Sequence, residues 1–148
     1  MRTKYFGNSI GLEDDALSER PLHIYVAGPY SGITKTRVEQ NVATAIKVGV
    51  EVIRKGHYPY IPHLTHFVDR VEGKSLTLLW DDHLDWGLSW LDRSDALLYI
   101  GGSRGADIEL EYALKRGKMV FRSIEEVPSL GSRRYYVRQL KVDEPGAK

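Results

Sequence analysis

The segment Gly101–Ala113 (GGSRGADIELEYA) combines a glycine-rich turn with a glutamate. It follows the apolar run Ala96–Ile100, which is typical of a buried parallel strand, and it opens a helical pattern. Glycine and serine at a strand-to-helix turn leave backbone N–H groups free to bind an anion. Glu109 lies about a turn and a half into that helix, so its carboxylate is expected near the same place. This arrangement predicts chemistry on a nucleotide or a glycoside.

The elements that must position these residues alternate between strand and helix patterns along the chain. Strands are indicated by runs of β-forming residues, and helices by apolar residues at spacings of three and four. A long connection, Pro62–Ser75, interrupts the alternation. The predicted elements are strand Leu22–Ala27, helix Arg37–Lys55, strand Tyr58–Ile61, helix Leu76–Arg93, strand Ala96–Ile100, a helix capped by Ser103 and ended by Gly117, strand Met119–Phe121, and one helical turn at Ser123–Val127.

This order predicts an α/β fold: a single-domain, doubly wound (flavodoxin-like) parallel sheet of four to five strands with helices on both faces. Pro59 indicates either the start of a strand or an edge strand. Ligands of such sheets bind beyond the carboxyl ends of the strands. Three segments fall at such ends, namely Gly28–Gly32, Pro62–His66 and Gly101–Gly105.

The domain organisation follows from where the periodic patterns begin and end. Residues 1–20 are polar and aperiodic, and we expect a flexible arm or a lid there. Residues 21–128 form the α/β domain. The C-terminal extension, residues 129–148, mixes arginines with tyrosines and is expected to add an edge strand or a subunit contact.

Composition narrows the classes of function. The chain has 148 residues and a formal net charge of +1, which disfavours partners such as nucleic acid or an acidic membrane surface. With no cysteine there is no disulfide, thiolate nucleophile or cysteine zinc site. Neither a membrane-spanning run nor the apolar core of a signal peptide is present, so we expect a cytoplasmic location.

Two motifs together resemble the nucleoside 2-deoxyribosyltransferase family and its relatives, the 2′-deoxynucleoside 5′-monophosphate N-glycosidases. One is Ile24–Gly32 (IYVAGPYSG), and the other is Ser103-x-Gly105-x-x-x-Glu109-Leu110-x-Tyr112-Ala113. The resemblance runs from about Leu22 to Phe121. It implies a flavodoxin-like fold and cleavage or transfer at the N-glycosidic bond of a nucleoside or nucleotide. It also implies a site without metal or cofactor, completed across the subunits of a homo-oligomer (a dimer or larger).

The resemblance assigns roles to particular residues. Glu109 matches the glutamate nucleophile, and Ser103 the serine that holds the 5′-phosphate, with Gly105 in the same turn. Tyr25 matches a site tyrosine at the end of the first strand. The substrate loop corresponds to Gly28, Tyr30, Ser31 and Gly32. Apart from the resemblance, Tyr30 and Trp86 could each stack on the base or be a core residue.

One position departs from the family pattern. The family has an aspartate on the preceding helix, eight residues before the aspartate that opens the third strand, and counting back from Asp95 gives Gly87. The nearest carboxylate is Asp85, on a different face of the helix. We therefore expect either that Asp85 takes the second carboxylate's role through a local change in the helix, or that this role is missing.

The predicted chemistry explains why carboxylates are needed. Breaking an N-glycosidic bond builds positive charge on the anomeric carbon of the sugar. A carboxylate below the ring stabilises that charge or attacks to form a glycosyl-enzyme. A second carboxylate can orient the sugar or move a proton to the departing base.

Histidines and aspartates in the same region raise other interpretations. His63 and His66 have the spacing of a metal pair, but neither lies in a recognised metal motif. We treat His63 as a substrate-binding residue and expect no metal, and the same holds for the run Asp81-Asp82-His83.

Two alternative functions remain open. Phosphoribohydrolases carry the loop Pro-Gly-Gly-x-Gly-Thr-x-x-Glu, but here Ile100 replaces the proline and an extra residue precedes Gly105. The second alternative is a nucleotide-binding module without turnover, which the missing aspartate at Gly87 would explain.

Overall fold

The structure is a computed structural model that describes residues 20–71 and 76–130. Its sheet has four parallel strands in the order β2-β1-β3-β4. Most of the predicted N-terminal arm and C-terminal extension lies outside the described residues. The strands are β1 (His23–Ala27), β2 (Tyr58–Tyr60), β3 (Ala96–Tyr99) and β4 (Met119–Phe121). The predicted parallel α/β fold is confirmed, and Pro59 does lie in an edge strand.

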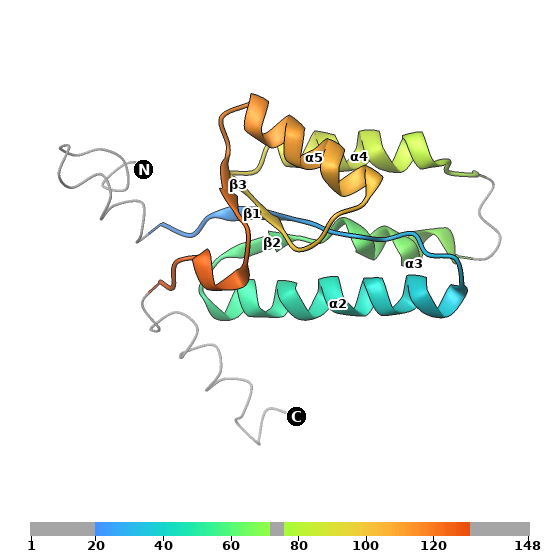
Figure 1. Cartoon of the computed structure of the whole chain (residues 1–148), viewed down its shortest axis with the longest axis horizontal. Helices are drawn as coiled ribbons and strands as arrows, with labels where there is room; N and C mark the ends of the chain where they lie inside the picture. The colour runs from blue at the N-terminus through green and yellow to red at the C-terminus, as the bar shows by residue number, and fades with distance from the viewer. Residues whose placement is uncertain (1–19, 72–75, 131–148) are drawn as a thin grey trace, which may run out of the picture.

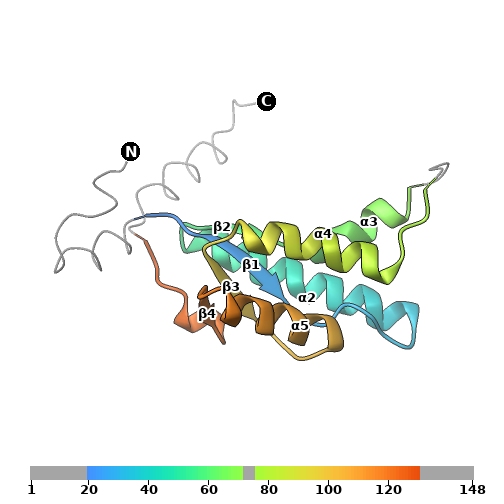
Figure 2. The same cartoon turned by 90° about the horizontal axis from the view of Figure 1, so that it is seen from above.

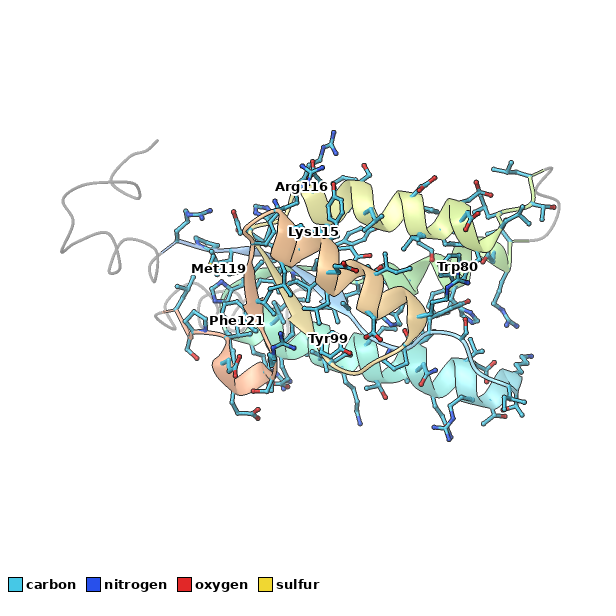
Figure 3. All side chains as sticks on the ribbon, turned by 45° about the horizontal axis from the view of Figure 1, so that its top comes forward. Trp80, Tyr99, Lys115, Arg116, Met119 and Phe121 are labelled. Carbon is cyan, nitrogen blue, oxygen red and sulfur yellow. The ribbon has the colours of Figure 1, made fainter. Side chains whose placement is uncertain are left out.

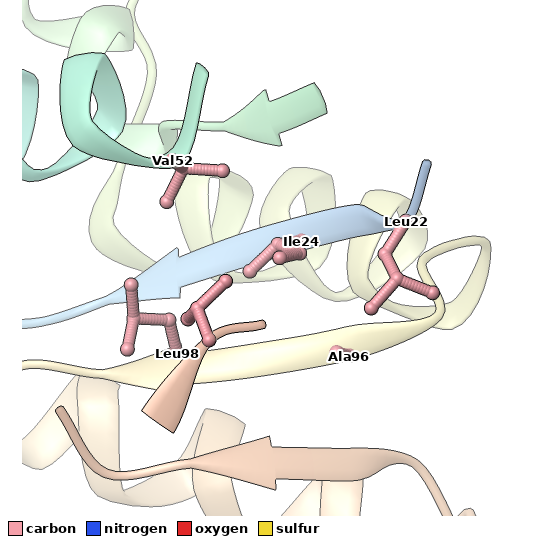
Figure 4. Close-up of a cluster of buried hydrophobic side chains, with 6 residues drawn as sticks. Leu22, Ile24, Val52, Ala96 and Leu98 are labelled. Atoms are coloured by element: carbon pink, nitrogen blue, oxygen red, sulfur yellow. The ribbon is translucent and has the colours of Figure 1, made fainter. Parts of the chain in front are cut away.

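Helices cover both faces of the sheet (Figures 1 and 2). Helix α2 (Lys35–Arg54) packs on one face, while α4 (Trp80–Asp92) and α5 (Arg104–Lys115) pack on the other. Alternate residues of each strand point to opposite faces, which divides the core into two clusters. The cluster under α2 contains Ile24, Val52 and Leu98 (Figure 4). The cluster under α4 and α5 contains Tyr25, Leu91 and Leu97.

The strand order creates a topological switch point. From β1 the chain crosses to β2 on one side and then to β3 on the other, so the connections leaving β1 and β3 diverge at the carboxyl edge of the sheet. A crevice forms at such a point in open α/β sheets, and ligands bind there. The predicted segments Gly28–Gly32 and Gly101–Gly105 flank this crevice from β1 and β3.

The connection after β2 differs from its prediction as a loop. Residues Pro62–Leu64 form a 3-10 turn, and Thr65–Asp69 form a short helix, α3. The Thr65 hydroxyl donates to the Pro62 carbonyl at 2.9 Å and holds the turn. A five-residue helix is too short to produce a periodic pattern in the sequence, which is why the prediction missed it.

Local hydrogen bonds explain where the two site-bearing helices begin. The carboxylate of Asp82 accepts from the Leu79 N–H at 2.8 Å, so α4 begins at Trp80 and not at the predicted Leu76. Ser103 caps α5 as predicted, its Oγ accepting from the Ala106 N–H at 3.1 Å.

After α5 the chain turns through Gly117 with a φ of +70°, a conformation that favours glycine. Within the described residues no helix is long and apolar enough to span a bilayer.

A buried histidine fastens the amino end of β1, opposite the crevice. His57 is 2% exposed. Its Nδ1 accepts from the Leu22 N–H at 3.0 Å, and its Nε2 contacts the Pro128 carbonyl at 2.6 Å. Nε2 must therefore carry the proton of a neutral ring, and burial lowers the pKa of this imidazole.

We predict that protonation of His57 contributes to acid destabilisation. The unfolded chain binds this proton at a higher pH than the folded chain, so stability is lost as the pH falls below about 6.5. Replacing His57 with Gln should lower the free energy of unfolding at pH 7.5 by about 2–4 kcal/mol and flatten its dependence on pH between 7 and 5.5. Urea titrations across that range measure both effects. An unchanged slope in the variant would contradict the assignment.

Candidate active site

A cavity of about 350 Å³ lies at the carboxyl edge of the sheet. Its walls come from the loop after β1, the segment from β2 to α3, one face of α4, and the first turns of α5. This volume is in the range of small-molecule sites. The cavity occupies the crevice at the switch point, so the two motifs singled out in the sequence meet around it.

Glu109 lies on the wall formed by α5 and is only 9% exposed. It shares the buried stripe of the helix with Ala106 and Ala113, because residues at spacings of three and four point the same way. The hydroxyl of Tyr25 donates to Glu109 Oε2 at 2.6 Å. Burial raises the pKa of Glu109 to about 7, against the smaller, opposite effect of that hydrogen bond.

Tyr25 comes from β1 and is fully buried beneath the cavity. Burial and the adjacent Glu109 carboxylate raise its pKa well above the ordinary value, so it remains a phenol and a donor at physiological pH. Its ring stacks on Tyr60, with centroids 5.6 Å apart, and Tyr60 stacks in turn on Trp90 at 5.4 Å. These aromatic contacts fix the direction in which the hydroxyl points.

Gly87 of α4 faces this hydrogen bond. A Cβ at this position would lie 2.4 Å from the Tyr25 hydroxyl and 3.4 Å from Glu109 Oε2. The space that a side chain would need at position 87 is thus occupied by the tyrosine oxygen. A side chain at position 87 would therefore fit only if the Tyr25 hydroxyl moved or were absent.

The amino end of α5 forms a corner of the cavity that is suited to an anion. Arg104 and Gly105 occupy its first turn, where backbone N–H groups have no partner within the helix. The guanidinium of Arg104 lies over the Trp80 ring, 4.3 Å from its centroid, and both residues line the cavity. Figure 3 shows Trp80 at the end of the molecule where α4 and α5 begin. The helix dipole and the guanidinium both favour a negative group here.

The loop after β1 supplies another wall, through Gly28, Tyr30 and Ser31. A Cβ on Gly28 would lie 2.4 Å from the Ile100 side chain, so glycine lets this loop approach β3 closely. The side-chain amide of Asn41 donates to the carbonyls of Tyr30 and Ser31 at 3.1 and 3.2 Å and holds the loop.

The two histidines after β2 have separate partners. His63 is 4% exposed, and its Nε2 lies 3.1 Å from both the Gly28 and the Pro29 carbonyl oxygens. His66 Nδ1 lies 3.0 Å from the Tyr30 hydroxyl. Across residues 20–71 and 76–130, no group of three or more His, Asp or Glu side chains is arranged to hold a metal ion.

Asp69 of α3 and His83 of α4 face each other across one side of the cavity. His83 Nε2 lies 2.9 Å from Asp69 Oδ2, and both residues line the cavity. The His83 nitrogen is enclosed, and its contact with the carboxylate lacks the geometry of a hydrogen bond. The His83 ring lies nearly parallel to that of Trp86, at 11° and 6.2 Å between centroids.

The structure brings together most of the site residues predicted from the sequence. The predicted residues that line the cavity are Gly28, Tyr30, Ser31, His63, Ser103, Gly105 and Glu109. Tyr25 acts from beneath, through Glu109. Asp85 and Gly32 are exposed and lie outside the cavity wall. Trp86 is not on the wall either and packs against His83.

Sequence reasoning considered Asp85 and Trp86 of α4 but missed most of the residues of this helix that line the cavity. Trp80, His83, Leu84 and Gly87 all line the cavity and recur at spacings of three and four. Residues at these spacings share one face of a helix, so the sequence contained a signal that His83 and Gly87 lie on the same face. Asp69 carried no comparable signal, because α3 was itself unrecognised.

Comparison with known proteins supplies a family. Residues 22–123, more than half of the chain, match the family described as "Domain of unknown function (DUF7768)". The chain belongs to this family. The matched part of the DUF7768 domain contains all four strands and every residue that lines the cavity. No curated protein was found to match the chain.

We predict that Glu109 lowers the stability of the DUF7768 domain at neutral and alkaline pH. Its pKa rises from an ordinary value of 4.5 to about 7 on folding, so stability falls as the pH rises between these values. Replacing Glu109 with Gln, which keeps an acceptor for Tyr25, should raise the free energy of unfolding at pH 8 by up to about 3 kcal/mol. Urea titration at pH 8 measures this gain. The exposed Glu111 is the matched control on the same helix, and Glu111→Gln should change stability by less than about 0.5 kcal/mol.

A second prediction concerns the steric coupling of Gly87 and Tyr25. Gly87→Ala should destabilise the fold by about 1–3 kcal/mol, since the new methyl group meets the tyrosine oxygen. Tyr25→Phe removes that oxygen, and the remaining ring carbon would lie 3.6 Å from the methyl, an ordinary contact. The cost of Gly87→Ala should therefore be smaller in the Tyr25→Phe background. A double-mutant cycle measures the coupling, and strict additivity would contradict it.

Proposed function

We propose that this chain is an enzyme that cleaves the N-glycosidic bond of a nucleoside or nucleoside 5′-monophosphate, with Glu109 as the nucleophile. The observation that carries the proposal is a buried carboxyl group, 9% exposed and bonded to Tyr25, in the wall of a cavity that also contains the corner of α5 suited to an anion. The sequence resemblance to nucleoside 2-deoxyribosyltransferases supports the same assignment.

The environment of Glu109 suits this chemistry. As the bond to the base breaks, positive charge develops on the anomeric carbon, and a carboxylate in a poorly solvated site attracts that charge strongly. The carboxylate then forms a bond to this carbon, giving a glycosyl-enzyme. Tyr25 donates to one carboxylate oxygen and leaves the other for the sugar. Water or a second base then displaces the glutamate.

The position of the corner at the amino end of α5 supports a phosphorylated substrate. Ser103, Arg104 and Gly105 present backbone N–H groups and a guanidinium, and they lie on the same helix as Glu109. A 5′-phosphate bound there would hold the sugar within reach of the carboxylate. The absence of a Cβ at Gly105 lets a ligand approach the backbone closely. The resemblance further implies a homo-oligomer, and we include this oligomeric state in the proposal.

A second candidate function is nucleotide binding without turnover. The observation that favours it is the absence of a side chain at Gly87 together with the exposed position of Asp85 outside the cavity. Calorimetry that detects binding of nucleoside monophosphates, with no free base after long incubation, would favour this function over catalysis.

The proposed function predicts release of free base from a panel of nucleosides and 5′-monophosphates, followed by chromatography. Glu109→Gln should reduce the rate by at least about a thousandfold, because the nucleophile is removed. Glu111→Gln, on the exposed side of the same helix, should leave the rate unchanged. Base release by Glu109→Gln at the parent rate would refute the nucleophile assignment.

The same assay has an expected pH dependence. The nucleophile must be ionised, and the pKa of Glu109 is about 7. The value of kcat/KM should therefore fall about tenfold for each pH unit below 7.

A further inference from the structure

The proposed reaction needs a proton donor for the departing base, and Glu109 is already used as the nucleophile. A base that leaves with its electron pair is a poor leaving group unless a ring nitrogen is protonated. General acids of this kind contribute about 10²–10⁴-fold to rates. With no side chain at Gly87 and Asp85 outside the cavity, the donor has to come from another residue on the cavity wall.

One of the two imidazoles on that wall is unsuited to the role. His63 Nε2 faces two backbone carbonyl oxygens at 3.1 Å, so this nitrogen carries the proton and is held by the loop after β1. Its buried Nδ1 is without a hydrogen-bond partner in the described structure, which leaves it as an acceptor. Burial lowers the pKa of His63, so the ring stays neutral. His63 Nδ1 can therefore accept a hydrogen bond from a ligand. The one proton of the ring is on Nε2, where the loop after β1 holds it, so it is not available to a leaving group.

His83 has the opposite surroundings. A carboxylate oxygen of Asp69 lies 2.9 Å from its Nε2, and the side chains of His83 and Asp69 are 24% and 32% exposed. A carboxylate in direct contact with one ring nitrogen fixes the orientation of the imidazole and leaves the other nitrogen for a ligand. The other charged or titratable side chains on the cavity wall are Tyr30, Tyr60, His63, Arg104 and Glu109. Among all of them, Asp69 is the group in direct contact with the His83 ring.

The position of His83 on α4 places it beside the reacting centre. It precedes Gly87 by four residues, about 6 Å along the same face of the helix. A Cβ at Gly87 would itself be 3.4 Å from Glu109 Oε2. His83 thus lies one helical turn from the residue of α4 that faces Glu109, toward the end of the cavity where α3 faces α4. Packing of the ring against Trp86 fixes its plane.

We infer that His83, positioned by Asp69, is the general acid that protonates a departing purine, an inference that rests on the proposed function. Glu109 forms a bond to the anomeric carbon while the bond from that carbon to the base nitrogen breaks and its electron pair moves into the ring. The His83 imidazolium gives its Nδ1 proton to purine N7, and the base leaves as a neutral molecule. Water then attacks the glycosyl-enzyme, and neutral His83 takes the proton that this water releases. Glu109 departs as a carboxylate, and one water is consumed for each base released.

The test uses substrates that do or do not need a proton. A purine methylated at N7 already carries a positive charge and leaves without protonation. The full chain is assayed at pH 6.5 with guanosine and 2′-deoxyguanosine 5′-monophosphates, each with and without the N7 methyl group. His83→Gln should lower kcat at least about a hundredfold on the unmethylated substrate that the parent accepts, and less than tenfold on its methylated counterpart. Asp69→Asn should show the same selectivity with a smaller loss.

Controls separate this role from damage to the fold. His23 and Asp95 form another imidazole–carboxylate pair, 3.7 Å apart, at the amino end of β1 and away from the cavity. His23→Gln should leave kcat on all four substrates unchanged. Activity of His83→Gln on the methylated nucleotide itself demonstrates a folded site with an intact nucleophile.

The outcomes are distinguishable from failure of the proposed function. If the parent releases base from no nucleotide, the proposed function is wrong and the acid role falls with it. If the parent is active, the His83 assignment is overturned by a loss below tenfold on the unmethylated substrate or by equal losses on both. Release of pyrimidine bases alone would also contradict it, since the assigned proton acceptor is a purine nitrogen.

Discussion

The hydrogen bond between Tyr25 and Glu109 is the constraint around which the rest of the site is arranged. It joins β1 to α5 in a region from which solvent is nearly excluded. A carboxyl group in such a place titrates near neutral pH, and a phenol beside it stays protonated. Tyr60 and Trp90 hold the phenol by stacking, and Gly87 leaves the room that it needs. Burial of Glu109 thus lowers the stability of the fold at neutral pH and leaves a carboxyl group that titrates near pH 7, as functional groups often do.

The fold explains why these groups meet. Because the connections from β1 and β3 diverge, the sheet leaves a crevice that packing of its own helices does not fill. α4 and α5 both begin at this edge, so their first turns face the crevice while their later turns bury Leu91 and Ala113 against the sheet. At the amino end of β1, both ring nitrogens of His57 have backbone partners, and no described residue there lines the cavity. The candidate site and this structural support therefore lie at opposite ends of the sheet.

The sequence predicted the fold and much of the site because those parts depend on periodicity and on turn chemistry. Apolar runs such as Ala96–Tyr99 are read directly as buried strands, and Ser103 is a strong helix cap. Leu114 follows Leu110 by four residues, the spacing of one helix face, but it is 53% exposed because α5 covers the sheet only along a narrow stripe. Asp69 and His83 could not be paired from sequence, since their contact depends on how α3 and α4 pack.

The departure at Gly87 acquires a different meaning once the Tyr25 oxygen is seen in its space. In the sequence it looked like the loss of a functional group, whereas in three dimensions it is one half of a fitted pair. Tyr25 and Gly87 are therefore coupled in this fold, because a side chain at position 87 fits only if the oxygen of residue 25 moves or is absent. The residue that α4 can carry at position 87 is thus limited by a β-strand far from it along the chain.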